Sequence, residues 1–148
     1  MQKLILITSL LLTSNSWAEE LPLLNADDIP STEYVSNRCW ALTRTIIWFA
    51  TEKEFKEKEI VDPEEIKKRE KYWMSVLFHT VTENRGYELY SEEAMEHVKK
   101  THYIYLAAYK DGANKHIDKT GSMLSELVTA DGKFCGEISW YKDRKPKV

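Results

Sequence analysis

Apolar residues recur at spacings of three and four over most of the chain, and this periodicity restricts its fold more than any other feature. Such spacing places the residues on one face of a helix. The four stripes, in chain order, are Val35, Cys39, Leu42, Ile46 and Phe49; Ile66, Trp73, Leu77 and Thr80; Ala94, Met95, Val98, His102, Tyr105, Leu106 and Tyr109; and Ile117, Gly121, Leu124, Leu127 and Val128. With only five glycines and no run of alternating polarity, we predict an all-α domain, a compact bundle of about four helices.

Helix start signals precede the first three stripes. Ser31 or Thr32 can cap the first helix, and Ser91 opens the third. Asp62 followed by Pro63 is the clearest of these signals, because the aspartate can cap and proline suits the first helical position. The charged stretch before it, residues 51–59, either continues the first helix or forms a connector.

Glycines suggest where the helices end. Gly86 follows Asn84 and Arg85 and predicts the end of the second helix. By the same reasoning Gly112 is predicted to end the third helix, and the fourth is predicted to end near Asp131 and Gly132.

The first 18 residues have the order of a cleavable export signal. Lys3 supplies a positive start, an apolar run covers residues 4–12, and Ser16 and Ala18 are small residues at the positions that a signal peptidase reads. The apolar run is about half of the roughly 20 residues that a membrane-spanning helix needs. We therefore predict a periplasmic protein, released by cleavage of this signal peptide and without stable membrane insertion.

Cleavage would leave residues 19–148, enough for one domain with a single core. We divide them into an extended lead-in (19–30), a helical domain (31–141) and a basic tail (142–148). Residues 133–148 fit either a short helix or a strand. The formal net charge of the chain is −3, which argues against a nucleic-acid partner. The basic tail is interpreted as a solubilising segment, with contact to anionic lipid or cell-wall polymer as the alternative.

Two cysteines, Cys39 and Cys135, are the whole thiol content of the chain. In an oxidising compartment such a pair is expected to form a disulfide. Closing a loop of this length stabilises a fold by up to roughly 4.7 kcal/mol in the chain-entropy model. The bond would fasten the end of the chain to the first helix; two buried free thiols are the alternative.

Few residues suggest a metal or cofactor, and we predict none. Glu93 and His97 share a helix face but have no third ligand, so they are interpreted as a surface ion pair. His102 lies on an apolar stripe, where it is either a core residue or a functional one. A carrier of a small ligand, metal or haem would use His102 with Tyr105 and Tyr109.

Catalytic motifs are equally scarce, and no catalytic residue is predicted. The chain has no nucleophile elbow and no glycine-rich phosphate loop. A cell-wall hydrolase would have to rely on helix carboxylates such as Glu33. That residue is more simply explained as a first-turn glutamate that favours the helix dipole.

Aromatic residues crowd the second half of the chain. Tyr87 and Tyr90 lie in the connector before the third helix, and Tyr103 lies off its apolar stripe. Tyrosine is favoured at protein interfaces because it buries a large area at a small entropic cost. We therefore select these three as candidate partner-binding residues.

The organisation resembles that of small exported helical proteins of Gram-negative bacteria, such as the periplasmic immunity proteins against type VI secretion effectors. The matching features are the cleavable signal, the helical domain, Cys39 on the first helix, and Cys135 followed by Trp140 and Tyr141. This resemblance implies a non-catalytic protein that binds and neutralises a protein partner, a toxin or a cell-wall enzyme. A phage-type periplasmic lysis regulator and a small-ligand carrier are the alternatives, and the oligomeric state is left open.

Overall fold

The computed structural model describes residues 21–25, 27, 28 and 31–137. They form four α-helices and one short 3-10 helix: α1 (Thr32–Glu52), η1 (Lys58–Ile60), α2 (Pro63–Arg85), α3 (Glu92–Thr120) and α4 (Glu126–Glu137). Apart from an isolated bridge between Asn25 and Asp28, these residues contain no β-structure. The prediction of an all-α fold with about four helices is confirmed. The predicted signal peptide (1–18), the predicted basic tail (142–148) and residues 138–141 at the end of the predicted helical domain lie outside the described residues.

The three helix start signals are confirmed. The side chains of Ser31, Asp62 and Ser91 each accept a hydrogen bond from a backbone N–H in the first turn of α1, α2 and α3. These bonds satisfy donors that have no partner within the helix. Ser125 does the same for α4, where its hydroxyl accepts from the backbone N–H of Val128 at 3.2 Å.

The helix ends were predicted less well. Gly86 ends α2 with a φ of 69°, as expected. Gly112 and Gly132 do not end their helices: α3 continues to Thr120 and stops at Gly121, with a φ of 74°, while α4 runs through Gly132 to Glu137. A glycine inside a helix costs about 1 kcal/mol relative to alanine. Burial of Ile117, worth roughly 1.5–3 kcal/mol, outweighs that cost in α3.

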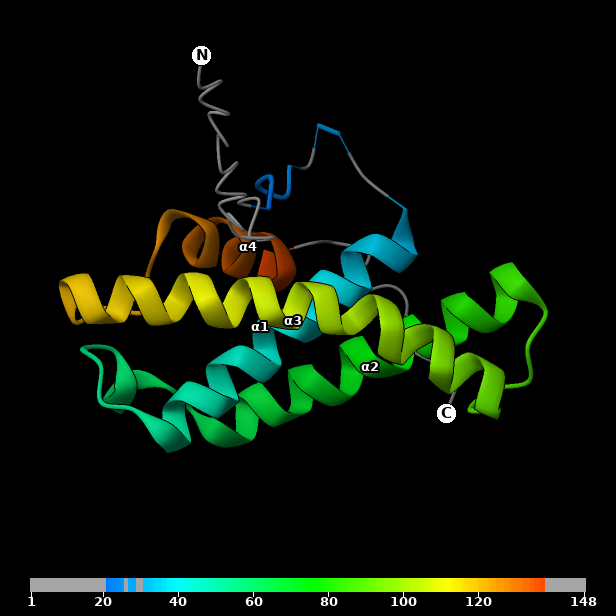
Figure 1. Cartoon of the computed structure of the whole chain (residues 1–148), viewed down its shortest axis with the longest axis horizontal. Coiled ribbons are helices and arrows are strands. Elements are labelled where there is room, and N and C mark those ends of the chain that lie inside the picture. Colours follow the sequence, from blue (N-terminus) through cyan, green and yellow to red (C-terminus); the bar gives the residue numbers. More distant parts are fainter. Residues whose placement is uncertain (1–20, 26, 29–30, 138–148) are drawn as a thin grey trace, which may run out of the picture.

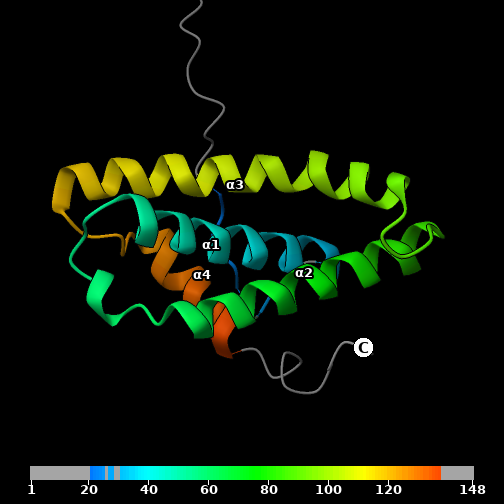
Figure 2. The ribbon, with the colours of Figure 1, turned by 90° about the horizontal axis from the view of Figure 1, so that it is seen from below.

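α1 is the central helix of the bundle and contacts each of the other three α-helices. Figure 1 shows the long helices running side by side, and Figure 2 shows α1 between α3 and α2, with the short α4 crossing beside them. Polar as well as apolar side chains of α1 are therefore buried, including Asn37, Arg38 and Thr45. The charged stretch after it proves to be a connector, because α1 ends at Glu52 and only η1 is helical before α2.

Three apolar clusters make up the core. The middle one contains residues of all four α-helices and includes Leu24, so the lead-in is partly incorporated in the fold. A second lies where the α1–α2 connector meets the α3–α4 connector, and a third joins α2 to α3 through Leu77, Phe78, Val81, Ala94 and Val98. In the part of the chain that the structure describes, no helix is both long and apolar enough to cross a membrane.

Candidate functional site

The predicted disulfide is present between Cys39 on α1 and Cys135 on α4. The two Cα atoms are 5.7 Å apart, and the bond closes a separation of 96 residues. Both cysteines are buried in the middle cluster. Since α4 has only 12 residues, the disulfide is a major part of its attachment to the bundle.

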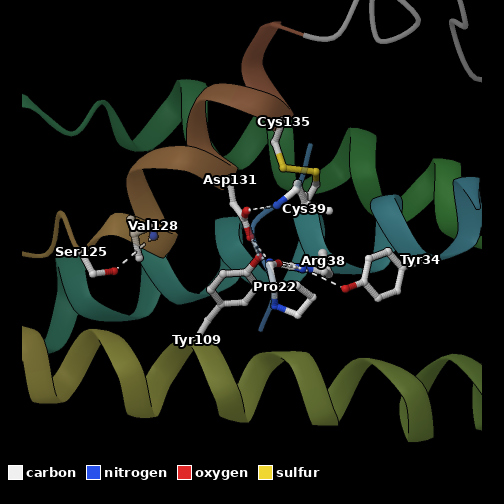
Figure 3. A network of polar contacts seen from close by, with 10 residues as sticks. Pro22, Tyr34, Arg38, Cys39, Tyr109, Ser125, Val128, Asp131 and Cys135 are labelled. Atoms are coloured by element: carbon white, nitrogen blue, oxygen red, sulfur yellow. Dashed lines mark hydrogen bonds and ion pairs between the residues drawn. A yellow bond between two sulfur atoms is a disulfide. The ribbon is translucent and has the colours of Figure 1, made fainter. Parts of the chain in front are cut away.

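A buried ion pair lies beside the disulfide and joins the same two helices. Arg38 precedes Cys39 by one residue, and Asp131 precedes Cys135 by one helical turn. The guanidinium Nη2 of Arg38 donates to Oδ2 of Asp131, and both side chains are 0% exposed (Figure 3). A buried charge pair is tolerated only when its remaining donors and acceptors are also satisfied.

The other polar atoms of this pair have partners. Arg38 Nε donates to the hydroxyl of Tyr109 at 3.1 Å, and its Nη1 donates to the hydroxyl of Tyr34 at 2.8 Å and to the carbonyl of Pro22. Asp131 accepts from the backbone N–H of Leu24 at 2.9 Å and from the hydroxyl of Tyr109. The network thus holds the lead-in against α1 and α4 (Figure 3).

Tyr109 acts in this network as a neutral hydrogen-bond donor. Burial, with the Asp131 carboxylate as a second cause, raises its pKa well above the ordinary value because both disfavour the phenolate. Its proton is already donated to Asp131, and its oxygen accepts from Arg38. The cluster therefore offers no free base or nucleophile, and we assign it a structural role.

A second buried polar centre lies between α1 and α3. His102 is 2% exposed; its ring stacks on that of Trp40 at 3.8 Å between centroids, and its Nδ1 lies 2.9 Å from Oδ1 of Asn37. The amide nitrogen of Asn37 donates to the hydroxyl of Thr101 at 2.9 Å, so its oxygen is the end that accepts from His102. This assigns the proton of the imidazole to Nδ1.

The imidazole of His102 is uncharged in the folded chain. Burial, and secondly the cation of Arg44, lower its pKa from 6.5 to about 3. The side chain belongs to the core, which was one of the two interpretations that the sequence left open.

Glu33 sits in an ion-pair cluster at the N-terminal end of α1, in the first turn of the helix. Its carboxylate lies 2.8 Å from Nε2 of His97 on α3 and 3.6 Å from Nη2 of Arg85 at the end of α2. Burial alone would raise the pKa of Glu33, but His97 and Arg85 outweigh it, so the net shift is downward. A catalytic acid needs a raised pKa, so the arrangement favours a structural role. The predicted pairing of His97 with Glu93 is wrong, because Glu33 of a neighbouring helix is the partner.

The residues of the hypothetical carrier site do not form a common ligand-binding group. Tyr109 is held by Arg38 and Asp131, Tyr105 packs edge-on against Tyr34 at 5.5 Å, and His102 stacks on Trp40. Within the described ranges, no group of three or more His, Cys, Asp or Glu side chains is placed to hold a metal ion.

The three candidate partner-binding tyrosines lie in two regions. Tyr87 is half-buried against the apolar cluster of α2 and α3. Tyr90 is 48% exposed, has a φ of 60°, and rests on Phe78 with 4.9 Å between ring centroids. Tyr103 is 65% exposed on α3, beside Ile104 at 66%. At 1.5 Å per residue, Tyr103 lies roughly 16 Å along α3 from the connector that holds the other two.

Sequence reasoning did not select Arg38 or Asp131. A signal was nevertheless available, because a disulfide brings the neighbours of its cysteines together. Arg38 is adjacent to Cys39, and Asp131 is four residues before Cys135 on the same helix face. Two opposite charges in these positions predict an ion pair once the disulfide is assumed.

Comparisons with protein-family models, with curated proteins and with solved structures find no match to this chain. Its function must therefore be inferred from its own residues.

Proposed function

We propose that this chain is a non-catalytic periplasmic protein that binds and neutralises a protein partner, as an immunity protein or enzyme inhibitor does. The proposed contact face is the solvent side of α3 around Tyr103 and Ile104, extended toward Tyr90 at its N-terminal end. Such a protein acts by covering the active site of its partner, which requires a preformed surface and no catalytic group.

The observation that carries the proposal is the exposure of two large apolar side chains in the middle of a 29-residue helix. Tyr103 is 65% exposed and Ile104 is 66% exposed. Single exposed apolar residues are ordinary on protein surfaces, but an exposed tyrosine next to an exposed isoleucine provides the kind of anchor that dominates binding energy. A standard interface covers about 800 Å² per partner, enough to include Tyr90 as well.

The rigidity of the scaffold supports the same conclusion. α3 is fixed to α1 by the stacked pair of His102 and Trp40 and by the bond of Tyr109 to Arg38. Both ends of α3 have partners, since its cap Ser91 bonds to the first turn and Gly121 accepts from the backbone N–H of Lys56 at 2.9 Å. A preorganised face loses little entropy on binding, which favours high affinity.

The test is capture of a partner from periplasmic extract by the full tagged chain. A Tyr103→Asp/Ile104→Asp variant is expected to lose the partner, because it places two charges at the centre of the apolar contact. Ile60→Asp/Leu124→Asp is a matched control, since both side chains are exposed apolar residues on the connectors. The captured enzyme or toxin is then assayed with and without one equivalent of the protein.

Three results would refute the proposal: no partner at any salt concentration, equal capture by the Tyr103/Ile104 variant, or an unchanged activity of the captured protein.

The identity of the partner separates the two related functions. A toxin indicates an immunity protein, whereas a phage or host cell-wall enzyme indicates a lysis regulator. The mass of the chain recovered from the periplasm tests the signal peptide, because cleavage predicts residues 19–148.

A further inference from the structure

The middle of α3 presents an uncharged strip to solvent. Residues 101–109 contain no Asp, Glu, Lys or Arg, and the exposed residues among them are Tyr103, Ile104 and Ala107. Ile104 and Ala107 are three positions apart and share one helix face, while Tyr103 lies at the edge of that face. Figure 2 shows α3 along one edge of the bundle, with α1 and α2 on the same side of it. The strip is therefore a helix face that the described part of the fold leaves uncovered.

An ion pair stands at each end of this strip, and the two pairs have the same order of charge along the helix. On the N-terminal side Glu96 precedes Lys100, whose Nζ lies 2.7 Å from Oε1 of Glu96. On the C-terminal side Asp111 precedes Lys115, whose Nζ lies 2.8 Å from Oδ2 of Asp111. All four side chains are between 46% and 73% exposed. Along α3 the order is thus negative, positive, uncharged, negative, positive.

This order of charges is complementary to its own reverse. When two copies of α3 cross antiparallel at the middle of the strip, Lys100 of each copy lies opposite Asp111 of the other, and Glu96 lies opposite Lys115. These positions meet because the members of each pair are equally far from the middle of the strip. Two-fold symmetry repeats every contact. A parallel pair in register would instead set each charge against its own like.

Helix-packing geometry allows these contacts to form together. Residues four apart form ridges along a helix, and the strip and its flanking charges lie on two such ridges, within 96–104 and 107–115. Ridges of this kind interdigitate when two helices cross at about −50°. Because the helices then diverge, Glu93 and Asp118, like charges that are equally far from the middle of the strip, stay roughly 16 Å apart across the two copies.

From this self-complementary pattern we propose that the solvent side of α3 binds α3 of a second copy of this chain in an antiparallel, two-fold symmetric dimer. Ile104 of each copy packs against Ala107 of the other, whose small side chain lets the helices approach closely. The charged positions fix the direction and register of the pairing. Two crossed helices touch over only a few turns, less than the roughly 800 Å² per partner of a standard interface, so the dimer is weak and reversible.

The charges beside the strip favour a second copy over a strongly acidic or basic protein. The four charges sum to zero, so a partner of a single charge would be repelled by as many of them as attract it. The self-pairing does not rest on the proposed inhibitory function. Where both occur, the second copy and the protein partner compete for the same face, and dimerisation limits the availability of that face.

The test is analytical ultracentrifugation of the purified full chain, with its mass measured by mass spectrometry. The weight-average mass is expected to rise toward that of a dimer as the protein concentration increases from about 1 μM to 1 mM. Lys100→Glu sets a negative charge opposite Asp111 of the other copy, and Asp111→Lys sets a positive charge opposite Lys100. Each variant alone is expected to dimerise at least about tenfold more weakly than the wild type.

A mixture of the two variants is the decisive measurement. In the mixed dimer the introduced glutamate faces the introduced lysine, and the unchanged Asp111 of one chain faces the unchanged Lys100 of the other. Dimerisation is therefore expected to recover to within a few-fold of the wild type. Lys99→Glu is the matched control, because Lys99 is exposed but lies about 100° around the helix from Lys100, and it should change dimerisation by a few-fold at most. Unchanged thermal unfolding verifies that each variant is folded.

Four results would overturn the inference: a chain that stays monomeric throughout this range, equal losses for Lys100→Glu and Lys99→Glu, no recovery in the mixture, or full dimerisation by Tyr103→Asp/Ile104→Asp. These results are distinguishable from failure of the proposed function. A monomeric chain that captures an enzyme or toxin removes the self-pairing alone. A dimer of this kind that captures no partner removes the proposed function alone.

Discussion

Two adjacent residues of α1, Asn37 and Arg38, belong to the two buried polar centres of the molecule, and these centres differ in charge. The side chain of Arg38 points toward α4, where it pairs with the carboxylate of Asp131 and stays charged. Asn37 faces α3, where it meets His102, whose pKa has fallen to about 3. Burial disfavours charge in both places, but only the first supplies an opposite charge to compensate. The charged centre thus joins helices through an ion pair, and the neutral one through stacking and hydrogen bonds.

The largest effect is expected from breaking the charged centre. Arg38→Met should lower the free energy of unfolding by about 3–5 kcal/mol, because Asp131 is left buried without a counterion. Urea unfolding monitored by circular dichroism measures it. Arg44→Met is the control: Arg44 lies on the same helix but is partly exposed, 3.8 Å from Glu70, and should cost under about 1 kcal/mol. Equal losses of unfolding free energy for Arg38→Met and Arg44→Met would contradict the distinction between the buried ion pair and a partly exposed one.

Removing the disulfide should cost about 2–4 kcal/mol and act on α4 first. In Cys39→Ala/Cys135→Ala, backbone amides of α4 are expected to exchange with solvent faster, while those in the apolar α2–α3 contact keep their protection. Hydrogen exchange read by mass spectrometry resolves the two regions. The wild-type chain under reducing conditions serves as the control and should match the variant. An equal loss of protection from exchange in α4 and in the α2–α3 contact would show that α4 does not depend specifically on the disulfide.

The neutral centre should make stability fall in mild acid. Since the pKa of His102 is about 3 when folded and 6.5 in its ordinary state, the unfolded chain binds a proton more readily between these values. Stability therefore rises with pH across this window and falls as pH drops below 6.5. At pH 5 we expect a loss of roughly 2 kcal/mol from this group.

His102→Gln tests this assignment, because its side-chain amide can still donate to Asn37 but does not titrate. Its stability should change less than that of the wild type between pH 7 and pH 5. The ring proton shifts of His102, followed by NMR, should keep their neutral values throughout that range. A titration with a midpoint near 6.5 would show that the imidazole is not sealed from water as described.

The smallest effect concerns Glu33, which is charged but less deeply buried than Asp131. Its lowered pKa contributes stability above the ordinary value of 4.5 and loses it as pH falls below that value. Glu33→Gln should cost under about 1 kcal/mol at pH 7. Glu93→Gln is the matched control, expected to have no effect on thermal unfolding. A larger loss of stability for Glu93→Gln than for Glu33→Gln would mean that His97 pairs with Glu93.

The sequence was sufficient for the features that depend on local chemistry. Periodic apolar residues predicted the first three helices, and Ser31, Asp62 and Ser91 marked their starts, because a cap needs only its own first turn. The fourth stripe was placed too early, because Ile117 belongs to α3 and Gly121 ends that helix. The helix ends predicted at Gly112 and Gly132 were wrong, because the burial of side chains beyond these glycines outweighs the small cost of a glycine within a helix. Tyr103 was predicted to lie off the apolar stripe of its helix, and it is exposed. Its role in binding stays a prediction.

The buried polar centres were harder to predict because each unites residues distant in sequence. Arg38 and Asp131 are 93 positions apart, and Pro22 and Leu24 join them from a segment predicted only to be extended. A charged residue on a helix is ordinarily assigned to solvent. Only the disulfide, which sets Cys39 against Cys135, could have shown that these charges face each other.

A double-mutant cycle between Arg38 and Asp131 tests most directly whether the ion pair joins α4 to α1. Arg38→Met, Asp131→Leu and the combined variant are each unfolded in urea at pH 7. We predict that the combined variant loses at least about 2 kcal/mol less stability than the two single losses added together, because neither charge is then left alone. Losses that add within about 0.5 kcal/mol would contradict the account, since they would show that the two charges do not interact in the folded chain.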